Sequence, residues 1–340
     1  MSALRRAVWT EDGLALEAVD PPPLPEGWAR LRVEACGICG TDLGLLHGEL
    51  PRSARTVPGH EFVGTVLDGP AGLPDARYGA NPMVTCGGCE HCRAGEWNLC
   101  RRGGAGIGLG RNGGIADWVD VPVGNLVRLD DSIDATVGML TEPTAVAVRG
   151  VGLAGIAAGD PVAVIGAGTI GLLAAAVART RTDHVVLSVR HPHQAAAAQR
   201  LGIETVAEQD TMAWGKDARP TTVIETAGGD GRSLDTAIRI ARRGGQVLVL
   251  GTFRTIGVDL FVALQKEVTI RPSYAYGNRH GVDDLTETAA TLVQLRDSIG
   301  SLVTHRFGLD DVLAAFATAG DKSTGAIKVA ITPGTPAPAG

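Results

Sequence analysis

A glycine-rich turn between an apolar strand and an alanine-rich helix restricts the fold of this chain more than any other feature. Residues 162–165 predict a buried strand, and residues 172–179 predict a helix. Residues 166–171 read Gly-Ala-Gly-Thr-Ile-Gly, a G-x-G-x-x-G pattern in the context that dinucleotide binding requires. The glycines permit a tight turn and let a pyrophosphate approach the helix N-terminus. A turn without a ligand is the alternative. The residues expected at the cofactor are Gly166, Gly168, Thr169, Ile170 and Gly171.

The alternation of strand and helix continues after this turn. Strands are predicted at residues 185–189, 223–227 and 246–250, and helices at residues 194–201 and 233–241. Repeated βα units predict a doubly wound parallel sheet in a dinucleotide-binding domain over residues 151–285. The 18 residues 161–178 carry no charge and have the length of a membrane span, but their glycines favour the buried strand, turn and helix.

The end of the second predicted strand indicates which dinucleotide is preferred. A fold that binds NAD usually has an acidic residue there, which holds the ribose 2′-hydroxyl. This chain has Ser188-Val-Arg190-His instead, and a guanidinium group can pair with a 2′-phosphate. We therefore expect NADP(H) to be preferred over NAD(H). The alternative is that Arg190 is a solvated loop residue.

Four cysteines in the first part of the chain predict a closed metal site. Cys86, Cys89 and Cys92 form two overlapping C-x-x-C steps, and Cys100 follows eight positions later. Four thiolates suit a structural zinc site. An iron–sulfur cluster also takes four thiolates, but this spacing resembles neither ferredoxin pattern. Disulfides are the remaining alternative, and a cytoplasmic protein rarely contains them.

Further metal donors are dispersed along the first 142 residues. Cys39, His60 and Glu61 lie close in sequence, and Glu142 stands far from them between a threonine and a proline. Sulfur, nitrogen and oxygen donors from separate loops suit a catalytic zinc, which must leave room for substrate. Alternatives remain for each residue alone. Cys36 and Cys39 could be a redox pair, His60 a core histidine and Glu142 a surface carboxylate.

The first domain is predicted to be mainly antiparallel β-structure, with short alternating runs between residues 5 and 35. Residues 136–151 have helical spacing, with Pro143 near the middle, which should break the helix at Glu142. Helices are also expected at residues 282–295 and 312–319, and a closing strand at residues 326–331.

Composition limits the partners and the compartment. The chain has 340 residues, 44% of them hydrophobic, and a net charge of −6. No basic patch is present, so nucleic acid is not an expected partner. The N-terminus shows no secretory signal, which favours a cytoplasmic protein without a membrane association.

The order of these motifs resembles the zinc-dependent medium-chain alcohol dehydrogenases, especially the branch with sorbitol-type polyol, threonine and sugar dehydrogenases. The resemblance covers nearly the whole chain. It rests on the dinucleotide pattern and on the segments at residues 36–42 (Cys-Gly-Ile-Cys-Gly-Thr-Asp), 58–64 (Pro-Gly-His-Glu-Phe-Val-Gly), 98–100 and 141–143, together with the four-cysteine lobe. It implies an α/β fold in which a mainly-β, GroES-like catalytic domain of residues 1–150 and 286–340, with its zinc lobe at 86–100, flanks a Rossmann domain.

The resemblance also implies roles for individual residues. Cys39, His60 and Glu142 would be zinc ligands, with Glu61 either a fourth, exchangeable ligand or a close partner of the site. Thr41 matches the hydroxyl that passes on the substrate proton, although it could also cap a helix. One departure is Gly44, where many relatives carry a histidine of the proton relay. His47 follows three residues later.

These features predict a zinc-dependent enzyme that transfers a hydride between NADP(H) and a secondary alcohol or ketone. The expected substrates are small, polar molecules of the polyol, sugar or cyclitol type. Two zinc ions per chain and a homodimer or homotetramer are implied by the resemblance. Two alternatives stay open: a biosynthetic reductase of a conjugated or imine-like bond, and a non-catalytic regulator that binds a dinucleotide.

Overall fold

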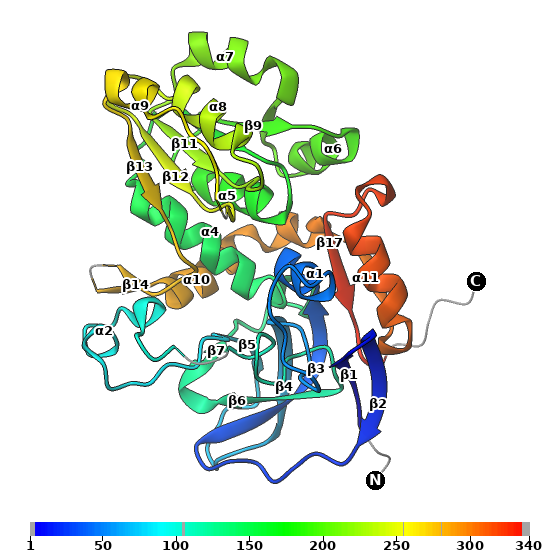
Figure 1. Cartoon of the computed structure of the whole chain (residues 1–340). Helices are drawn as coiled ribbons and strands as arrows, with labels where there is room; N and C mark the ends of the chain where they lie inside the picture. The colour runs from blue at the N-terminus through cyan, green and yellow to red at the C-terminus, as the bar shows by residue number, and fades with distance from the viewer. Residues whose placement is uncertain (1–3, 104–105, 254, 280, 335–340) are drawn as a thin grey trace. The chain divides into compact units, whose positions relative to one another are not determined.

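The chain forms two compact units. The computed structural model describes residues 4–103, 106–253, 255–279 and 281–334. The first unit consists of residues 1–142, 285–296 and 303–340, and the second of residues 143–284 and 297–302. Figure 1 shows the elements of both units. The sequence patterns predict the corresponding breaks after residues 150 and 285.

A seven-stranded sheet forms the centre of the first unit, with the order β16-β17-β3-β4-β5-β7 and with β6 paired to β3. In chain order its strands are β3 (Trp28–Gly37), β4 (Glu61–Asp68), β5 (Arg77–Ala80), β6 (Trp118–Pro122), β7 (Leu126–Arg128), β16 (Val303–Phe307) and β17 (Lys328–Ile331). A hairpin of β1 (Leu4–Thr10) and β2 (Gly13–Val19) forms a separate two-stranded sheet. The alternating runs near the N-terminus are therefore strands, as predicted.

The pairing of β3 brings distant segments together. Its last residue, Gly37, lies opposite Glu61 on β4 and opposite Ala330 on β17. The inner faces of these strands form an apolar core that includes Leu31, Cys36 and Phe62. Because β17 is buried along its whole length, a charged side chain on it needs a partner.

The helices of the first unit are short. They are α1 (Gly40–Leu46), α2 (Glu90–Arg93), α3 (Ala135–Gly138) and α11 (Val312–Gly320). Two further helices, α4 (Thr141–Ala154) and α10 (Asp284–Ile299), run across the limits of the units in sequence. Single turns of 3-10 helix occur at Trp97–Leu99, Val123–Asn125, Glu208–Asp210, Gly300–Leu302, Leu309–Asp311 and Lys322–Thr324.

The helical region predicted over residues 136–151, with a break at Glu142, is indeed interrupted, but the break lies just before that residue. The chain forms α3 and α4, which are separated by Met139 and Leu140. Pro143 occupies the first turn of α4 rather than its middle, and proline is tolerated there because that N–H has no intrahelical acceptor. Glu142 therefore lies at the beginning of a helix.

The second unit contains a six-stranded sheet of the order β10-β9-β8-β11-β12-β13, in which all pairs are parallel. The strands are β8 (Val162–Ile165), β9 (Val185–Val189), β10 (Glu204–Ala207), β11 (Thr222–Glu225), β12 (Gln246–Val249) and β13 (Thr269–Pro272). The helices are α5 (Thr169–Arg179), α6 (Pro192–Arg200), α7 (Thr211–Ala218), α8 (Arg232–Ile240) and α9 (Leu260–Lys266), and a small ribbon joins β14 (Asn278–Arg279) to β15 (Val282–Asp283).

The predicted doubly wound topology is present in this sheet. The chain starts at β8, builds outward through β9 and β10, and then returns to β11 on the other side of β8. This reversal marks the switch point where such folds bind ligands. The edge strands β10 and β13 are mostly exposed or half-exposed, so they lack the apolar runs by which the inner strands are found in the sequence.

The uncharged run at residues 161–178 does not form a long helix, because it divides into β8, the turn and α5. Among the described residues, no helix is both long and apolar enough to cross a membrane.

Candidate metal centres and dinucleotide site

Three of the predicted donors meet in the first unit. Cys39 caps the N-terminus of α1, His60 immediately precedes β4, and Glu61 is the first residue of that strand. One ligand atom from each lies within 4.8 Å of the others. His60 and Glu61 are buried, and Cys39 is half-buried. Gly59, with φ of +94°, makes the turn before them, and a Cβ there would lie 2.6 Å from the sulfur of Cys36.

Asp42 connects the two segments that carry these donors. Its carboxylate accepts hydrogen bonds from the N–H groups of Cys39, at 2.9 Å, and Gly59, at 3.3 Å. It also lies 3.8 Å from Nδ1 of His60, a buried nitrogen without a hydrogen-bond partner. A carboxylate beside the second nitrogen of a metal-binding histidine fixes the orientation and tautomer of the ring. Asp42 therefore holds the backbone of Cys39 and Gly59 by hydrogen bonds, and it acts on the ring of His60 through its charge.

Glu61 is held by a lysine from the other end of the chain. Nζ of Lys328, on β17, donates to both carboxylate oxygens of Glu61, at 2.8 and 2.6 Å, and to the carbonyl of Ile38, at 3.1 Å. The two side chains are 4% and 1% exposed. A Cβ at residue 37 would lie 2.2 Å from Oε2 of Glu61, so glycine at that position leaves the room that the carboxylate occupies.

Glu142 lies in the first turn of α4 and is not part of the tight three-residue group. Its charge nevertheless reaches that group, because it contributes to raising the pKa values of His60 and Lys328. Of the four predicted donors of this centre, three are therefore together, and the fourth is close enough to act on them electrostatically.

The charges around His60 are predominantly negative. Burial by itself would lower the pKa of His60, but Cys39, Asp42 and Glu142 raise it well above its ordinary value. Burial likewise opposes the charge of Lys328, and attraction to Glu61 and Cys39 raises its pKa above the usual range. Acidic groups therefore surround both His60 and Lys328, and they favour a cation at this site. A thiol, an imidazole and carboxylates are a donor set that fits zinc.

Thr41 lies in α1, and its Oγ1 accepts from the sulfur of Cys39 at 3.7 Å. The alternative interpretation of Thr41 as the N-cap is wrong, since Cys39 occupies that position. Gly44 is buried on the same helix, and a Cβ there would approach Leu50. His47 is exposed at the C-terminal end of α1.

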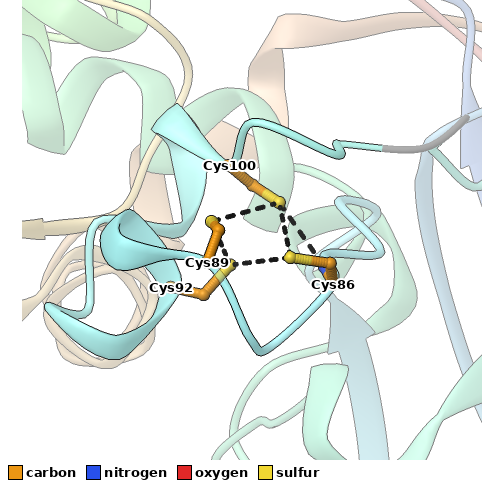
Figure 2. A group of neighbouring side chains, drawn as sticks. All are labelled: Cys86, Cys89, Cys92 and Cys100. Carbon is orange, nitrogen blue, oxygen red and sulfur yellow. Dashed lines mark hydrogen bonds between the residues drawn. The ribbon is translucent and has the colours of Figure 1, made fainter.

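The four cysteines of the second predicted metal site form a cluster in the first unit. Figure 2 shows their side chains pointing toward one another. The sulfur of Cys86 lies 3.5 Å from that of Cys100 and 3.9 Å from that of Cys92, and Cys89 lies 3.5 Å from Cys92 and 4.0 Å from Cys100. Four sulfur atoms about 2.3 Å from a central zinc ion are ~3.8 Å apart at the corners of a tetrahedron. The spacing in the structure fits such an ion.

The thiol groups of this cluster are already polarised for metal binding. Backbone N–H groups of Cys92 and Arg101 lower the pKa of Cys89 to about 6. Desolvation and hydrogen bonds to neighbouring thiols raise the pKa of Cys92 to about 11. Cys89 therefore loses its proton readily, whereas deprotonation of Cys92 is unfavourable. A bound dication would stabilise both thiolates and make the second deprotonation favourable.

The glycine-rich turn of the second unit has the geometry that the sequence predicts. Gly166 has φ of +98°, and Gly168 caps α5, whose first residues are Thr169 and Ile170. A Cβ at Gly171 would lie 1.7 Å from the carbonyl oxygen of Gly166, so only glycine allows this close approach. The hydroxyl of Thr226 donates to the carbonyls of Ile165 and Gly166 and fixes the turn at the switch point.

Arg190 follows β9, as predicted, but its guanidinium is paired. Nε and Nη2 each lie 2.6 Å from a carboxylate oxygen of Glu208, which follows the edge strand β10. The side chains are 63% and 48% exposed.

Comparison with known proteins identifies the family. Residues 25–131 match the model described as an alcohol dehydrogenase GroES-like domain, and residues 169–294 match the model described as a zinc-binding dehydrogenase. The L-threonine 3-dehydrogenase of Anaeromyxobacter sp. (strain K) is 30% identical over 317 residues, which are 86% of this chain and 89% of that protein. The chain belongs to the zinc-dependent medium-chain alcohol dehydrogenase family.

Solved structures agree with this assignment. A zinc-binding dehydrogenase from Sinorhizobium meliloti 1021, bound to NADP, is 30% identical and has a TM-score of 0.88 over 98% of this chain and 100% of that chain. The 2R,3R-butanediol dehydrogenase from Bacillus subtilis is 25% identical, with a TM-score of 0.85 over 97% and 100%. The predicted fold class and the prediction of an enzyme are confirmed. The protein is an NAD(P)-dependent alcohol dehydrogenase that acts on small molecules with zinc and a nicotinamide cofactor.

Three residues of this dehydrogenase carry contacts that the sequence analysis did not assign. Asp42 has a local signal, since an acidic residue three positions after a helix cap typically accepts backbone N–H groups. Lys328 has a weaker one, because it is a lysine at the start of an otherwise apolar strand. Glu208 has none, since nothing in its local pattern points to Arg190.

Proposed function

We propose that Cys39, His60 and Glu142 hold a catalytic zinc ion in this dehydrogenase, and that the enzyme transfers a hydride between NADP(H) and a small secondary alcohol or ketone. The observation that carries the proposal is the group of Cys39, His60 and Glu61, whose ligand atoms lie within 4.8 Å of one another, with Glu142 near enough to act on His60 electrostatically. In this assignment the first unit is the catalytic domain, and the second is the dinucleotide-binding domain.

Glu61 acts as a partner of the site in this proposal. Its two oxygens accept hydrogen bonds from Lys328, so the ammonium group orients the carboxylate beside Cys39 and His60. Glu61 would in addition be available as an exchangeable fourth ligand once one of these hydrogen bonds is released.

The residues around the centre have different roles in the reaction. A bound zinc ion would supply Lewis-acid chemistry, lowering the pKa of a hydroxyl group and polarising a carbonyl. Asp42 lies beside Nδ1 of His60, and with zinc bound its carboxylate would orient the ring so that the other nitrogen faces the ion. Thr41 is beside Cys39, and in a proton relay its hydroxyl would accept a proton at Oγ1 and release its own O–H proton onward. With Gly44 in place of an imidazole, the proton has to leave by a path that does not use that position.

We assign a second, structural zinc ion to Cys86, Cys89, Cys92 and Cys100, which gives two ions per chain. The distances between the sulfur atoms support this stoichiometry. The preference for NADP(H) is supported by Arg190 and by the absence of an acidic residue at the end of β9.

The substrate class is proposed from chemistry shared with the relatives. L-Threonine and 2R,3R-butanediol, which appear in their names, are small molecules whose secondary hydroxyl has a polar neighbour on the next carbon. We propose a substrate of this kind, including polyols, sugars and cyclitols.

An exposed apolar surface of the second unit supports a homo-oligomer. Leu260, Phe261 and Leu264 on α9 are 62–72% exposed, and Tyr274, just after the edge strand β13, is 65% exposed. Large apolar side chains gathered at the surface mark contact sites. Light scattering should give a dimer or tetramer, and Leu264→Glu should shift it toward the monomer, whereas an unchanged mass would refute this surface.

A substrate screen tests the proposed function directly. Purified protein would be assayed against vicinal diols, polyols, sugars, cyclitols and their ketones with NADPH, NADP, NADH and NAD. Metal analysis should find about two zinc ions per chain, and Cys39→Ser should reduce this to one and abolish turnover while the fold is kept. Full activity of Cys39→Ser without the second ion would refute the proposal. With deuterated NADPH, the label should appear on the carbon that carries the new hydroxyl group. Deuterium on a carbon of a reduced C=C or C=N bond would point to a reductase of that bond instead.

A further inference from the structure

The residue expected to receive the 2′-phosphate of NADP is already occupied by an acidic side chain. The guanidinium of Arg190 makes two parallel hydrogen bonds of 2.6 Å with the carboxylate of Glu208. The parallel pairing of β9 and β10 sets this contact, because Val189 lies opposite Ala207 and the next residue on each strand is one member of the pair. A carboxylate in this bidentate arrangement occupies the same donors that a phosphate group would use.

Several donors beside this pair are engaged as well. The backbone N–H groups of Arg190 and His191 both donate to the side-chain oxygen of Gln194, at 3.0 and 3.1 Å. Arg232, the nearby arginine whose charge acts on Glu208, is itself paired with Asp230 at 2.7 Å. The hydrogen bonds from Arg190 lower the pKa of Glu208, so the carboxylate is ionised at neutral pH.

We infer that Glu208 is a specificity-determining residue which limits the preference of this enzyme for NADP(H) by competing with the 2′-phosphate for Arg190. The inference rests on the proposed role of Arg190. To bind NADP, the protein has to separate Arg190 from Glu208 and tolerate the carboxylate near a phosphate of charge about −2. To bind NAD, it leaves the pair intact. The pair therefore reduces the advantage that Arg190 alone would give to the phosphorylated cofactor.

The change Glu208→Gln isolates this effect. Glutamine keeps the length of the side chain and a hydrogen bond to the guanidinium, but it removes the negative charge. We expect it to strengthen binding of 2′,5′-ADP by about tenfold, which corresponds to ~1.4 kcal/mol, and to leave 5′-AMP unchanged. These two nucleotides differ only in the 2′-phosphate, so the comparison needs neither the substrate nor turnover.

The matched control is Glu204→Gln. Glu204 is exposed on the same edge strand and carries the same charge, but it lies four residues earlier, which is about 13 Å along a strand. Titration calorimetry would measure both nucleotides with the wild type, Glu208→Gln, Glu204→Gln and Arg190→Gln. Retained binding of 5′-AMP would show that each variant is folded.

Each outcome decides the matter. A gain for 2′,5′-ADP with Glu208→Gln alone supports the inference. An equal gain in 2′,5′-ADP binding with Glu204→Gln would overturn it, because the loss of one negative charge from this strand would then explain the tighter binding. If Arg190→Gln no longer distinguishes 2′,5′-ADP from 5′-AMP, and Glu208→Gln binds 2′,5′-ADP no more tightly than the wild type, the inference is refuted. The proposed preference for NADP(H) then still stands. If the wild type does not distinguish the two nucleotides and Arg190→Gln changes nothing, the proposed role of Arg190 falls and the inference falls with it.

Discussion

Replacement of Lys328 by methionine would test how the centre of the first unit is built. Methionine keeps most of the apolar stem and removes the ammonium group. The three hydrogen bonds of Nζ, two of them to Glu61 and one to the carbonyl of Ile38, are then lost. Because Glu61 is only 1% exposed, its carboxylate would remain buried among Cys39, Asp42 and Glu142 without its cationic partner.

The expected loss follows from the burial of the pair. Removing one partner of a fully buried ion pair costs about 3–5 kcal/mol, because the remaining charge is left uncompensated. The double change Lys328→Met with Glu61→Gln removes that charge as well. The free energy of unfolding of the double variant should therefore be ~1–3 kcal/mol higher than that of Lys328→Met alone. This difference is in the range of coupling energies for contacting residues. Zinc should reduce the loss in the single variant, because a cation beside Glu61 replaces part of the missing charge.

Urea denaturation of the zinc-free and zinc-loaded proteins, followed by tryptophan fluorescence, would measure these differences. Four of the five tryptophans, Trp9, Trp28, Trp97 and Trp118, are in the first unit, so the signal reports mainly on the unit that contains the pair. Urea is preferred to guanidinium chloride because it does not screen charges. Lys322→Met is the matched control, since Lys322 is exposed on the same part of the chain.

Two results would refute this reasoning. A loss below about 1 kcal/mol for Lys328→Met would mean that the pair behaves like an exposed salt bridge. A double variant no more stable than Lys328→Met would mean that the lost lysine matters through packing and not through the charge of Glu61.

Three further changes probe the other parts of the site. Asp42→Asn should weaken zinc binding at the catalytic centre about 10–100-fold, because His60 loses its orienting carboxylate, and chelator competition would measure it. Cys100→Ser should remove one of the two zinc ions and lower the melting temperature, with mass spectrometry and thermal denaturation as the assays; retention of both ions would count against a four-thiolate site. Gly171→Ala should abolish binding of NADPH, measured by its fluorescence, since the added methyl group meets a carbonyl at 1.7 Å. Gly124→Ala, at a glycine outside this turn where the space is open and φ is ordinary, is the control for an added methyl group and should bind NADPH as the wild type does.

The main features of the fold and of the centres are local in sequence, which is why they could be predicted. The inner strands β8 and β9 were found with the bounds that the structure has, because buried parallel strands are continuous apolar runs. The cysteine lobe spans 15 residues, from Cys86 to Cys100, and its spacing alone brings four sulfur atoms together. Cys39, His60 and Glu61 were found because each lies beside a glycine or another donor within one short stretch.

Only the tertiary structure decided which charged partners these side chains have. Lys328 reaches Glu61 across 267 positions because β17 joins the sheet beside β3, and no local pattern encodes that neighbour. The pairing of Arg190 with Glu208 has the same origin, since it depends on the pairing of β9 with β10. Sequence spacing fixes which atoms a short segment can present, whereas long-range strand pairing fixes the buried charges around them, and in a low-dielectric interior those charges set what the atoms can bind.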